Sequence, residues 1–115
     1  MSTTQPTANR ARFTLREVVA VTGGEIIHLA PPANDALEIV GVSTDTRTLG
    51  EGSLFVALRG EKFDGHAFLA QAAQAGAAAA MVEEVPTTEP PLTPLILVKN
   101  TVEALGALAA AHRQR

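Results

Sequence analysis

Two short apolar runs constrain the fold of this chain more than any other feature of its sequence. Leu54-Phe55-Val56-Ala57-Leu58 and Leu95-Ile96-Leu97-Val98 are continuous stretches of strand length, without the polar alternation of a strand that has one face in water. Such runs are typical of strands buried on both faces, and these strands need a layer of other elements on each side. The sequence therefore predicts an α/β domain.

Capping signals predict where the helices begin and end. Thr14 and Glu17 have the spacing of a capping box, and the helix that follows should stop at Gly23 and Gly24. Asn100, with Glu103 three residues later, should begin the last helix. The inward-facing stripe of that helix is expected to comprise Val102, Leu105, Ala109 and His112. A middle helix should bury Phe68, Leu69, Ala72 and Ala73 and stop at Gly76.

Three further strands are predicted at residues 25–29, 37–44 and 77–82. The alanines of 77–82 would also suit a helix, but a helix has just ended at a glycine there, which favours a strand. Residues 83–94 carry four prolines and are predicted to form an exposed loop. The predicted order of elements is α-β-β-β-α-β-β-α.

Composition excludes several functional classes. The 115 residues are 46% hydrophobic and 18% charged, which fits one globular domain. The absence of cysteine excludes disulfides, thiolate metal sites and cysteine nucleophiles. A net charge of -3 and only four aromatic residues, all Phe, argue against nucleic-acid binding. Residues 1–12 are expected to be a disordered tail without a secretion signal, and no apolar run suits a membrane span, so a cytoplasmic location is expected.

The first candidate site is Ser43-Thr44-Asp45-Thr46-Arg47, which follows a predicted strand. Ligands of α/β sheets bind at the carboxyl ends of strands, where loops present polar groups on a rigid scaffold. Hydroxyl groups and a guanidinium in such a loop suit phosphate oxygens. The alternative is a structural turn, in which Asp45 accepts from nearby backbone amides and pairs with Arg47.

The second candidate site is Gly60-Glu61-Lys62-Phe63-Asp64-Gly65-His66, between a predicted strand and a predicted helix. The unpaired N–H groups at a helix N-terminus favour an anion, and glycines let the backbone approach a ligand closely. The alternative is an ordinary helix start, with Asp64 as the N-cap, Phe63 as a hydrophobic staple and His66 on the surface. The segment is not a phosphate-binding P-loop, because it lacks Gly-Lys-Ser/Thr.

No catalytic or metal-binding constellation is recognisable. His28, His66 and His112 do not have the spacing of metal ligands. The chain has no Gly-x-Ser-x-Gly elbow, and two isolated carboxylates such as Asp45 and Asp64 do not by themselves indicate a glycosidase. Neither a catalytic residue nor a metal site is therefore predicted within this chain.

Two long segments carry a resemblance to a known family. Residues 42–47 and 52–66, together with Gln71-Ala72 and Gly76-Ala77, resemble the N-terminal domain of the Mur ligases of peptidoglycan synthesis. The resemblance runs from about Phe13 to the end of the chain. It is greatest to the branch that adds D-alanyl-D-alanine to UDP-N-acetylmuramoyl-tripeptide. The Asp-Thr-Arg at 45–47 departs from the Asp-Ser-Arg of the sister branch that adds the third peptide residue.

The resemblance implies one part of a larger ATP-dependent ligase. Enzymes of this family have an N-terminal domain that holds the UDP end of the substrate, a central domain that binds ATP and Mg²⁺, and a C-terminal domain that helps bind the incoming amine. Residues 13–115 are then the UDP-substrate-binding domain, with the central and C-terminal domains absent and no cofactor of its own. The last helix reaches Arg115 without a terminal capping signal, which is expected of a chain cut at a domain border.

The resulting prediction is a small mixed β-sheet with packed helices that anchors UDP-N-acetylmuramoyl-tripeptide for its parent ligase. Two alternatives remain: the same domain of the sister ligase, and a non-catalytic interaction module of this fold. The predicted UDP-binding residues are Ser43, Thr44, Asp45, Thr46, Arg47, Gly60, Glu61, Lys62, Phe63, Asp64 and His66.

Overall fold

A computed structural model describes residues 12–28, 36–58, 64–84 and 93–114. Among these residues the sheet has five strands in the order β2-β7-β6-β5-β4. They are β2 (Glu25–His28), β4 (Val42–Ser43), β5 (Leu54–Val56), β6 (Ala79–Val82) and β7 (Leu95–Leu97). The strands β4, β5, β6 and β7 are parallel, and β2 joins antiparallel to β7 at one edge. The sheet is therefore mixed, as predicted.

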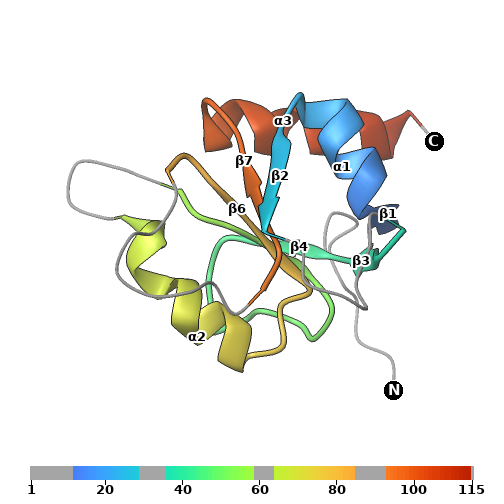
Figure 1. Ribbon diagram of the computed structural model, residues 1–115. Helices are drawn as coiled ribbons and strands as arrows, with labels where there is room; N and C mark the ends of the chain where they lie inside the picture. Colours follow the sequence, from blue (N-terminus) through green and yellow to red (C-terminus); the bar gives the residue numbers. More distant parts are fainter. Residues whose placement is uncertain (1–11, 29–35, 59–63, 85–92, 115) are drawn as a thin grey trace, which may run out of the picture.

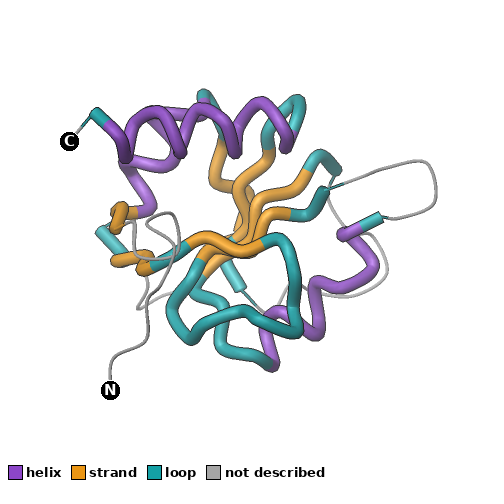
Figure 2. The backbone as a smooth tube through the Cα atoms, turned by 180° about the vertical axis from the view of Figure 1, so that it is seen from behind, coloured by secondary structure: helices purple, strands orange, loops and turns teal. Residues whose placement is uncertain are grey.

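Helices cover both faces of this sheet (Figure 1). The helices α1 (Leu15–Thr22) and α3 (Thr101–Arg113) pack on one face, and α2 (Leu69–Gln74), preceded by a 3-10 turn (Gly65–Phe68), packs on the other. Figure 2 shows the same layers from behind, with the strands between the helices. The predicted α/β architecture is thus confirmed.

The apolar run at 54–58 explains why two layers are needed. Leu54 and Val56 contribute to the core under α1 and α3, whereas Phe55 and Ala57 contribute to the core over α2. All four side chains are buried. Because successive side chains of a strand point to opposite faces, a run without polar residues supplies both cores at once.

Capping determines the ends of two helices as predicted. The Thr14 hydroxyl accepts a hydrogen bond from the Glu17 N–H, and a Glu17 carboxylate oxygen accepts one from the Thr14 N–H. Gly23 ends α1 in the left-handed conformation, with φ 73°. At α3 the Asn100 side chain accepts from the Glu103 N–H. These local hydrogen bonds fix the helix boundaries before any tertiary contact is considered.

One predicted strand is in fact two. Residues 37–44 form β3 (Glu38–Val40) and β4, separated by Gly41, whose φ of 90° turns the chain. The strand β3 pairs antiparallel with β1 (Arg12–Thr14) in a separate two-stranded sheet. The prediction of a single strand was wrong because β-propensity does not register a left-handed glycine. Arg12, assigned from sequence to the tail, is the first residue of β1; the rest of the tail lies outside the described residues.

The predicted inner stripe of α3 was also wrong in part. Val102 is 61% exposed, and the buried residues of the helix are Thr101, Ala104 and Leu108. Leu105 does pack against the core, as predicted. The helix is apolar nearly all round, so its sequence does not determine which side faces inward.

The alanine-rich segment confirms the remaining strand prediction. Residues 79–82 form β6, the central strand of the sheet, and all four residues are buried. Of the predicted proline-rich loop, residues 85–92 lie outside the described residues. Within the described part of the chain, no helix is long and apolar enough to cross a membrane.

Candidate functional site

The first predicted segment begins at the carboxyl end of β4, and the second follows the neighbouring parallel strand β5 in the sequence. Ser43 is the last residue of β4 and pairs in register with Phe55 of β5. Neighbouring strands lie about 4.8 Å apart, so the chain leaves β4 and β5 at adjacent positions. This is the edge at which ligands of parallel sheets bind, because the strands hold the loops in fixed positions.

The first segment is a tight turn held by its own side chains. The Ser43 Oγ accepts from the Asp45 N–H at 3.1 Å and donates to the Asp45 carbonyl at 3.0 Å. The Asp45 Oδ1 accepts from the Arg47 N–H at 2.9 Å. Asp45 and Arg47 also form an ion pair, with Nη2 to Oδ2 at 2.8 Å. Each feature of the structural-turn alternative is therefore present.

The same turn leaves polar groups available to a ligand. Thr44 and Thr46 are half-buried, and among the described residues neither hydroxyl has a hydrogen-bond partner. Arg47 is exposed. The five predicted residues of this segment thus divide into two groups. Ser43 and Asp45 hold the turn, and Thr44, Thr46 and Arg47 remain able to contact a ligand.

The Asp45–Arg47 pair also determines the charge of the turn. The hydrogen bonds that Asp45 accepts from the Arg47 side chain and backbone lower the pKa of the carboxyl. The same side-chain hydrogen bond, with the attraction between the charges, raises the pKa of the Arg47 guanidinium. Both groups are therefore charged throughout the neutral range, and their net charge is zero.

The second segment is described only at its C-terminal end, residues 64–66. Gly60, Glu61, Lys62 and Phe63 lie outside the described residues, as does the His66 side chain. At its base the Gly65 N–H donates to the Leu58 carbonyl at 2.6 Å. The Asp64 carbonyl accepts from the Ala67 N–H at 3.1 Å at the start of the 3-10 turn. The N-cap of α2 is Phe68, without a side-chain hydrogen bond, so Asp64 is not the N-cap of that helix.

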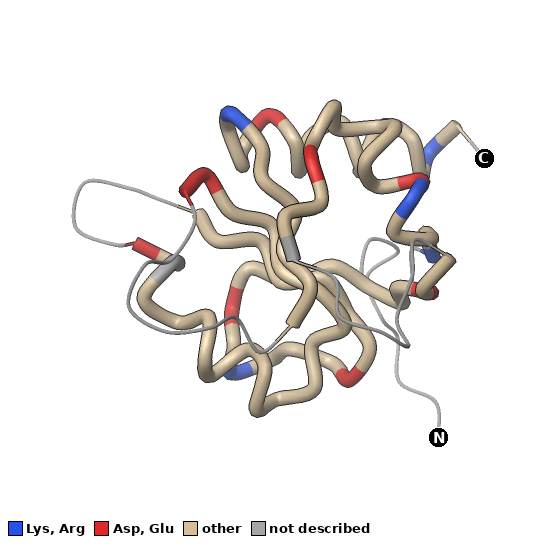
Figure 3. The backbone as a smooth tube through the Cα atoms, in the orientation of Figure 1, with Lys and Arg blue, Asp and Glu red and all other residues tan. Residues whose placement is uncertain are grey.

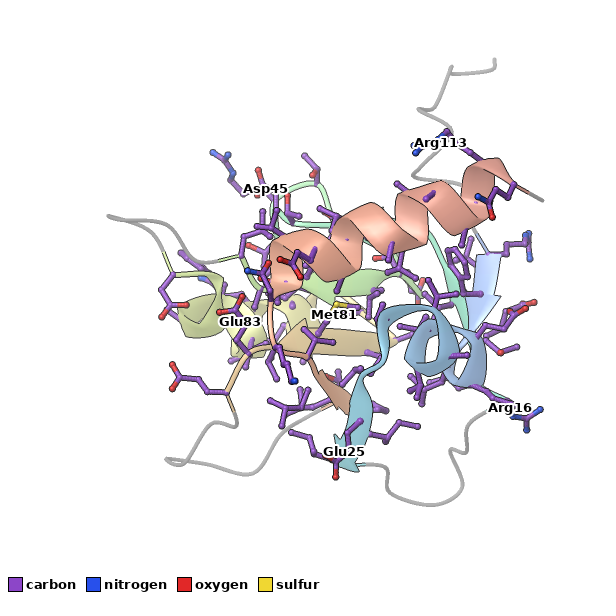
Figure 4. The ribbon with its side chains drawn as sticks, turned by 90° about the horizontal axis from the view of Figure 1, so that it is seen from above. Arg16, Glu25, Asp45, Met81, Glu83 and Arg113 are labelled. Atoms are coloured by element: carbon purple, nitrogen blue, oxygen red, sulfur yellow. The ribbon has the colours of Figure 1, made fainter. Side chains whose placement is uncertain are left out.

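A third polar contact at this edge was not predicted from the sequence. Glu83 directly follows β6, and its Oε2 accepts from the Thr101 N–H at 2.8 Å and from the Thr101 hydroxyl at 3.0 Å. Figure 4 shows Glu83 beside the first turn of α3, while Met81 of β6 lies beneath the helix. A carboxylate at this position satisfies orphan N–H groups and complements the helix dipole. An acidic residue at the end of a buried strand was the available signal.

Charged groups are confined to the periphery of the sheet. The strands β5, β6 and β7 contain no charged residue, and Figure 3 shows the acidic and basic residues in the surrounding loops and helices. Among the described residues, no group of three or more His, Asp or Glu side chains could hold a metal ion.

The sequence of this chain matches one protein-family model over most of the elements described above. Residues 38–113 match the model described as "Mur ligase family, catalytic domain", a range that contains both candidate segments and every element from β3 to α3. The chain belongs to the Mur ligase family. The resemblance drawn from residues 42–47 and 52–66 is thereby confirmed.

Curated relatives place the chain within this family. It is 44% identical over 86 residues to the UDP-N-acetylmuramoyl-tripeptide--D-alanyl-D-alanine ligase of Bacillus subtilis, a match that covers 75% of this chain and 19% of that protein. The ligase of the same name from Escherichia coli is 38% identical over 102 residues, covering 89% and 21%. A UDP-N-acetylmuramoyl-L-alanyl-D-glutamate--2,6-diaminopimelate ligase of Parabacteroides distasonis is 41% identical over 76 residues, covering 66% and 16%.

Solved structures show the same fold. A crystal structure of MurF from Acinetobacter baumannii superposes with a TM-score of 0.75 at 32% identity, covering 92% of this chain and 22% of that chain. MurF from Thermotoga maritima in complex with ADP superposes with a TM-score of 0.52 at 31% identity, covering 61% and 16%. The chain thus spans about a fifth of the length of the B. subtilis ligase and of the A. baumannii MurF chain.

Proposed function

We propose that this chain is the N-terminal, substrate-anchoring domain of an ATP-dependent peptidoglycan precursor ligase. It binds the UDP part of UDP-N-acetylmuramoyl-tripeptide while other domains of the parent enzyme add D-alanyl-D-alanine. The observation that carries the proposal is the Ser43–Arg47 turn: a self-supported loop at the carboxyl edge of a parallel sheet, with the Thr44 and Thr46 hydroxyls and the Arg47 guanidinium available.

The names of the relatives support the proposed substrate and branch. The B. subtilis and E. coli proteins are named as ligases of UDP-N-acetylmuramoyl-tripeptide and D-alanyl-D-alanine. A Mur ligase also crystallised with ADP, which supports ATP use by the parent enzyme. We assign ATP and Mg²⁺ to a central domain, because this sequence contains no Gly-Lys-Ser/Thr loop. The chain alone is therefore expected to have no ATPase activity and to form no peptide bond.

A titration of the ¹⁵N-labelled chain with UDP tests the proposal. Resonances in 43–47 and 60–66 should shift, while those of β1 and β3 should not. If UDP shifts neither segment, the site is wrong, and the alternative of a non-catalytic interaction module is favoured. Assays of a full-length parent with D-alanyl-D-alanine and with diaminopimelate separate the two ligase branches, since relatives of both kinds match this chain.

Single hydroxyl deletions test the role of the turn. Thr46→Val keeps the side-chain shape and should weaken UDP binding by roughly fivefold, which is the loss of affinity expected when one ordinary hydrogen bond is removed. Thr48→Val is the matched control, because the Thr48 hydroxyl already donates to the Asp45 carbonyl at 3.4 Å. UDP affinity in the control should stay near that of the wild type. Equal affinities for all three proteins would leave Thr46 with no part in UDP binding.

The second segment has its own test. Lys62→Ala should lower UDP affinity and flatten its dependence on salt, because the attraction between a lysine and a phosphate is screened by ions. Lys99 is an exposed lysine at the start of the last helix, and Lys99→Ala provides a control of equal charge change. If the two variants lose the same affinity, Lys62 contributes only general charge and does not contact the diphosphate.

A further inference from the structure

One carboxylate fixes both the backbone and the side-chain tip of Arg47. The Arg47 Nε lies 3.1 Å from Asp45 Oδ1 and 3.3 Å from Oδ2, and Nη2 lies 2.8 Å from Oδ2. The Arg47 N–H donates to the same Oδ1 at 2.9 Å. The carboxylate therefore grips the guanidinium along its Nε–Nη2 side, while the backbone hydrogen bond closes the turn beneath it.

The opposite end of the guanidinium is still available. Arginine has five side-chain N–H donors, and this grip uses the one on Nε and one on Nη2. Among the described residues, the two Nη1 hydrogens and the second Nη2 hydrogen have no partner. The Arg47 side chain is 86% exposed, and that of Asp45 is 38% exposed. The Nη1–Nη2 end thus presents a planar pair of donors, a geometry that matches two oxygens of a phosphate.

We infer that Asp45 is a positioning residue, which holds Arg47 so that the Nη1–Nη2 end of the guanidinium binds the diphosphate of UDP. The inference rests on the proposed function and changes the role of Asp45, which the sequence had placed among the ligand contacts. A long exposed side chain loses rotamer freedom when it binds a ligand. Holding the guanidinium in place beforehand removes part of that loss and so strengthens binding.

The direction in which UDP affinity changes separates the positioning role of Asp45 from simple charge repulsion. A carboxylate that only lay near the diphosphate would repel it, so removing the charge would strengthen UDP binding. A carboxylate that positions Arg47 has the opposite effect, because its removal frees the guanidinium. The two explanations therefore predict opposite changes for one substitution.

The test is a double-mutant cycle on the 115-residue chain, with UDP and uridine as separate probes. Asp45→Asn retains an oxygen for the Arg47 N–H but loses the grip on the guanidinium. Arg47→Gln should lower UDP affinity by about tenfold, because a charge-assisted contact on the surface is screened. Asp45→Asn should lower it by about threefold, and the double variant should bind no worse than Arg47→Gln. Uridine, which lacks the diphosphate, should bind all four proteins equally.

Two controls separate positioning from folding. Glu38→Gln removes another surface ion pair, Arg12 to Glu38 at 3.6 Å with both side chains 65% exposed, and should leave UDP binding unchanged. Arg47→Lys keeps the charge without the planar fork, and should lose most of the preference for UDP over uridine. An unchanged amide spectrum for Asp45→Asn outside residues 43–48 establishes that the variant is folded.

Each result has a definite meaning. Unchanged or tighter UDP binding by Asp45→Asn overturns the positioning role and leaves the proposed function intact. A loss that also affects uridine, or that persists in the Arg47→Gln background, means that Asp45 only maintains the turn, and again overturns the inference. If the wild-type chain binds neither UDP nor uridine, both the proposed function and the inference are wrong.

Discussion

One added methyl group at Gly65 should destabilise the fold. A Cβ there would lie 2.9 Å from the Ala57 Cα, 2.9 Å from the Leu58 N and 3.0 Å from the Leu58 O. All three atoms belong to the backbone just after β5, so no flexible side chain can move aside. The Gly65 N–H also donates to the Leu58 carbonyl at 2.6 Å, which joins Gly65 to the chain just after β5.

The expected destabilisation follows from this close approach. Forcing extra atoms into a packed site costs about 1–3 kcal/mol, and contacts with backbone atoms favour the upper half of that range. Gly106→Ala is the matched control, because nothing lies within 4 Å of a Cβ built on that mid-helix glycine. Alanine is preferred to glycine inside a helix by about 1 kcal/mol. One chemical change should therefore destabilise the protein at Gly65 and stabilise it at Gly106.

Urea unfolding followed by circular dichroism measures both free energies of unfolding, with m-values checked for equality. Thermal melts give a second reading, since 1 kcal/mol shifts the Tm of a domain of this size by about 4–8 °C. If Gly65→Ala lies within about 0.5 kcal/mol of wild type, a typical surface effect, the close approach of Gly65 to β5 is wrong. If both variants are destabilised alike, the room around each glycine does not determine the effect of the added methyl group on stability.

Three further predictions concern polar contacts. Glu83→Gln should destabilise the fold by about 1 kcal/mol in urea unfolding, since the carboxylate loses its charge at the start of α3; an unchanged midpoint would refute this. Thr14→Ala should cost about 1 kcal/mol by breaking the capping box with Glu17, whereas Thr14→Ser should restore most of it. The hydrogen bonds from Arg47 keep the pKa of Asp45 below its ordinary value of 3.8. The stabilising pair is thus fully present above that pH and lost as the pH falls through the lowered pKa. An NMR titration of the Asp45 carboxyl should therefore find a midpoint below 3.8 in the wild type, which Arg47→Gln raises.

Local signals predicted the elements that depend on local interactions. The Thr14 capping box, the Asn100 cap and the strands β5 and β7, predicted from the apolar runs at 54–58 and 95–98, all rest on residues within a few positions of one another. The strand β1 could not be predicted in this way. Its three residues form a strand because they pair with β3, and this partner is distant in the sequence.

The candidate site likewise contains contacts between residues close in the sequence, which could be predicted, and contacts between distant residues, which could not. The contacts inside the Ser43–Arg47 turn join residues two positions apart, so the residue types alone suggested the Asp45–Arg47 pair. The hydrogen bonds between Glu83 and Thr101 join residues 18 positions apart, and only the packing of α3 beside β6 brings them together. The sequence therefore indicated the turn but could not indicate what surrounds the edge of the sheet.

The pairing of β2 with β7 affects how the chain can fold during synthesis. The strand β2 lies near the start of the chain, yet its only neighbour among the described strands is β7, which precedes the last helix. At about 5–20 residues per second, a ribosome takes several seconds to make the intervening segment. During that time α1 can cover only the part of the core that β5 and β6 supply, and β2 has no partner among the described strands. The five-stranded sheet is completed only when β7 has emerged.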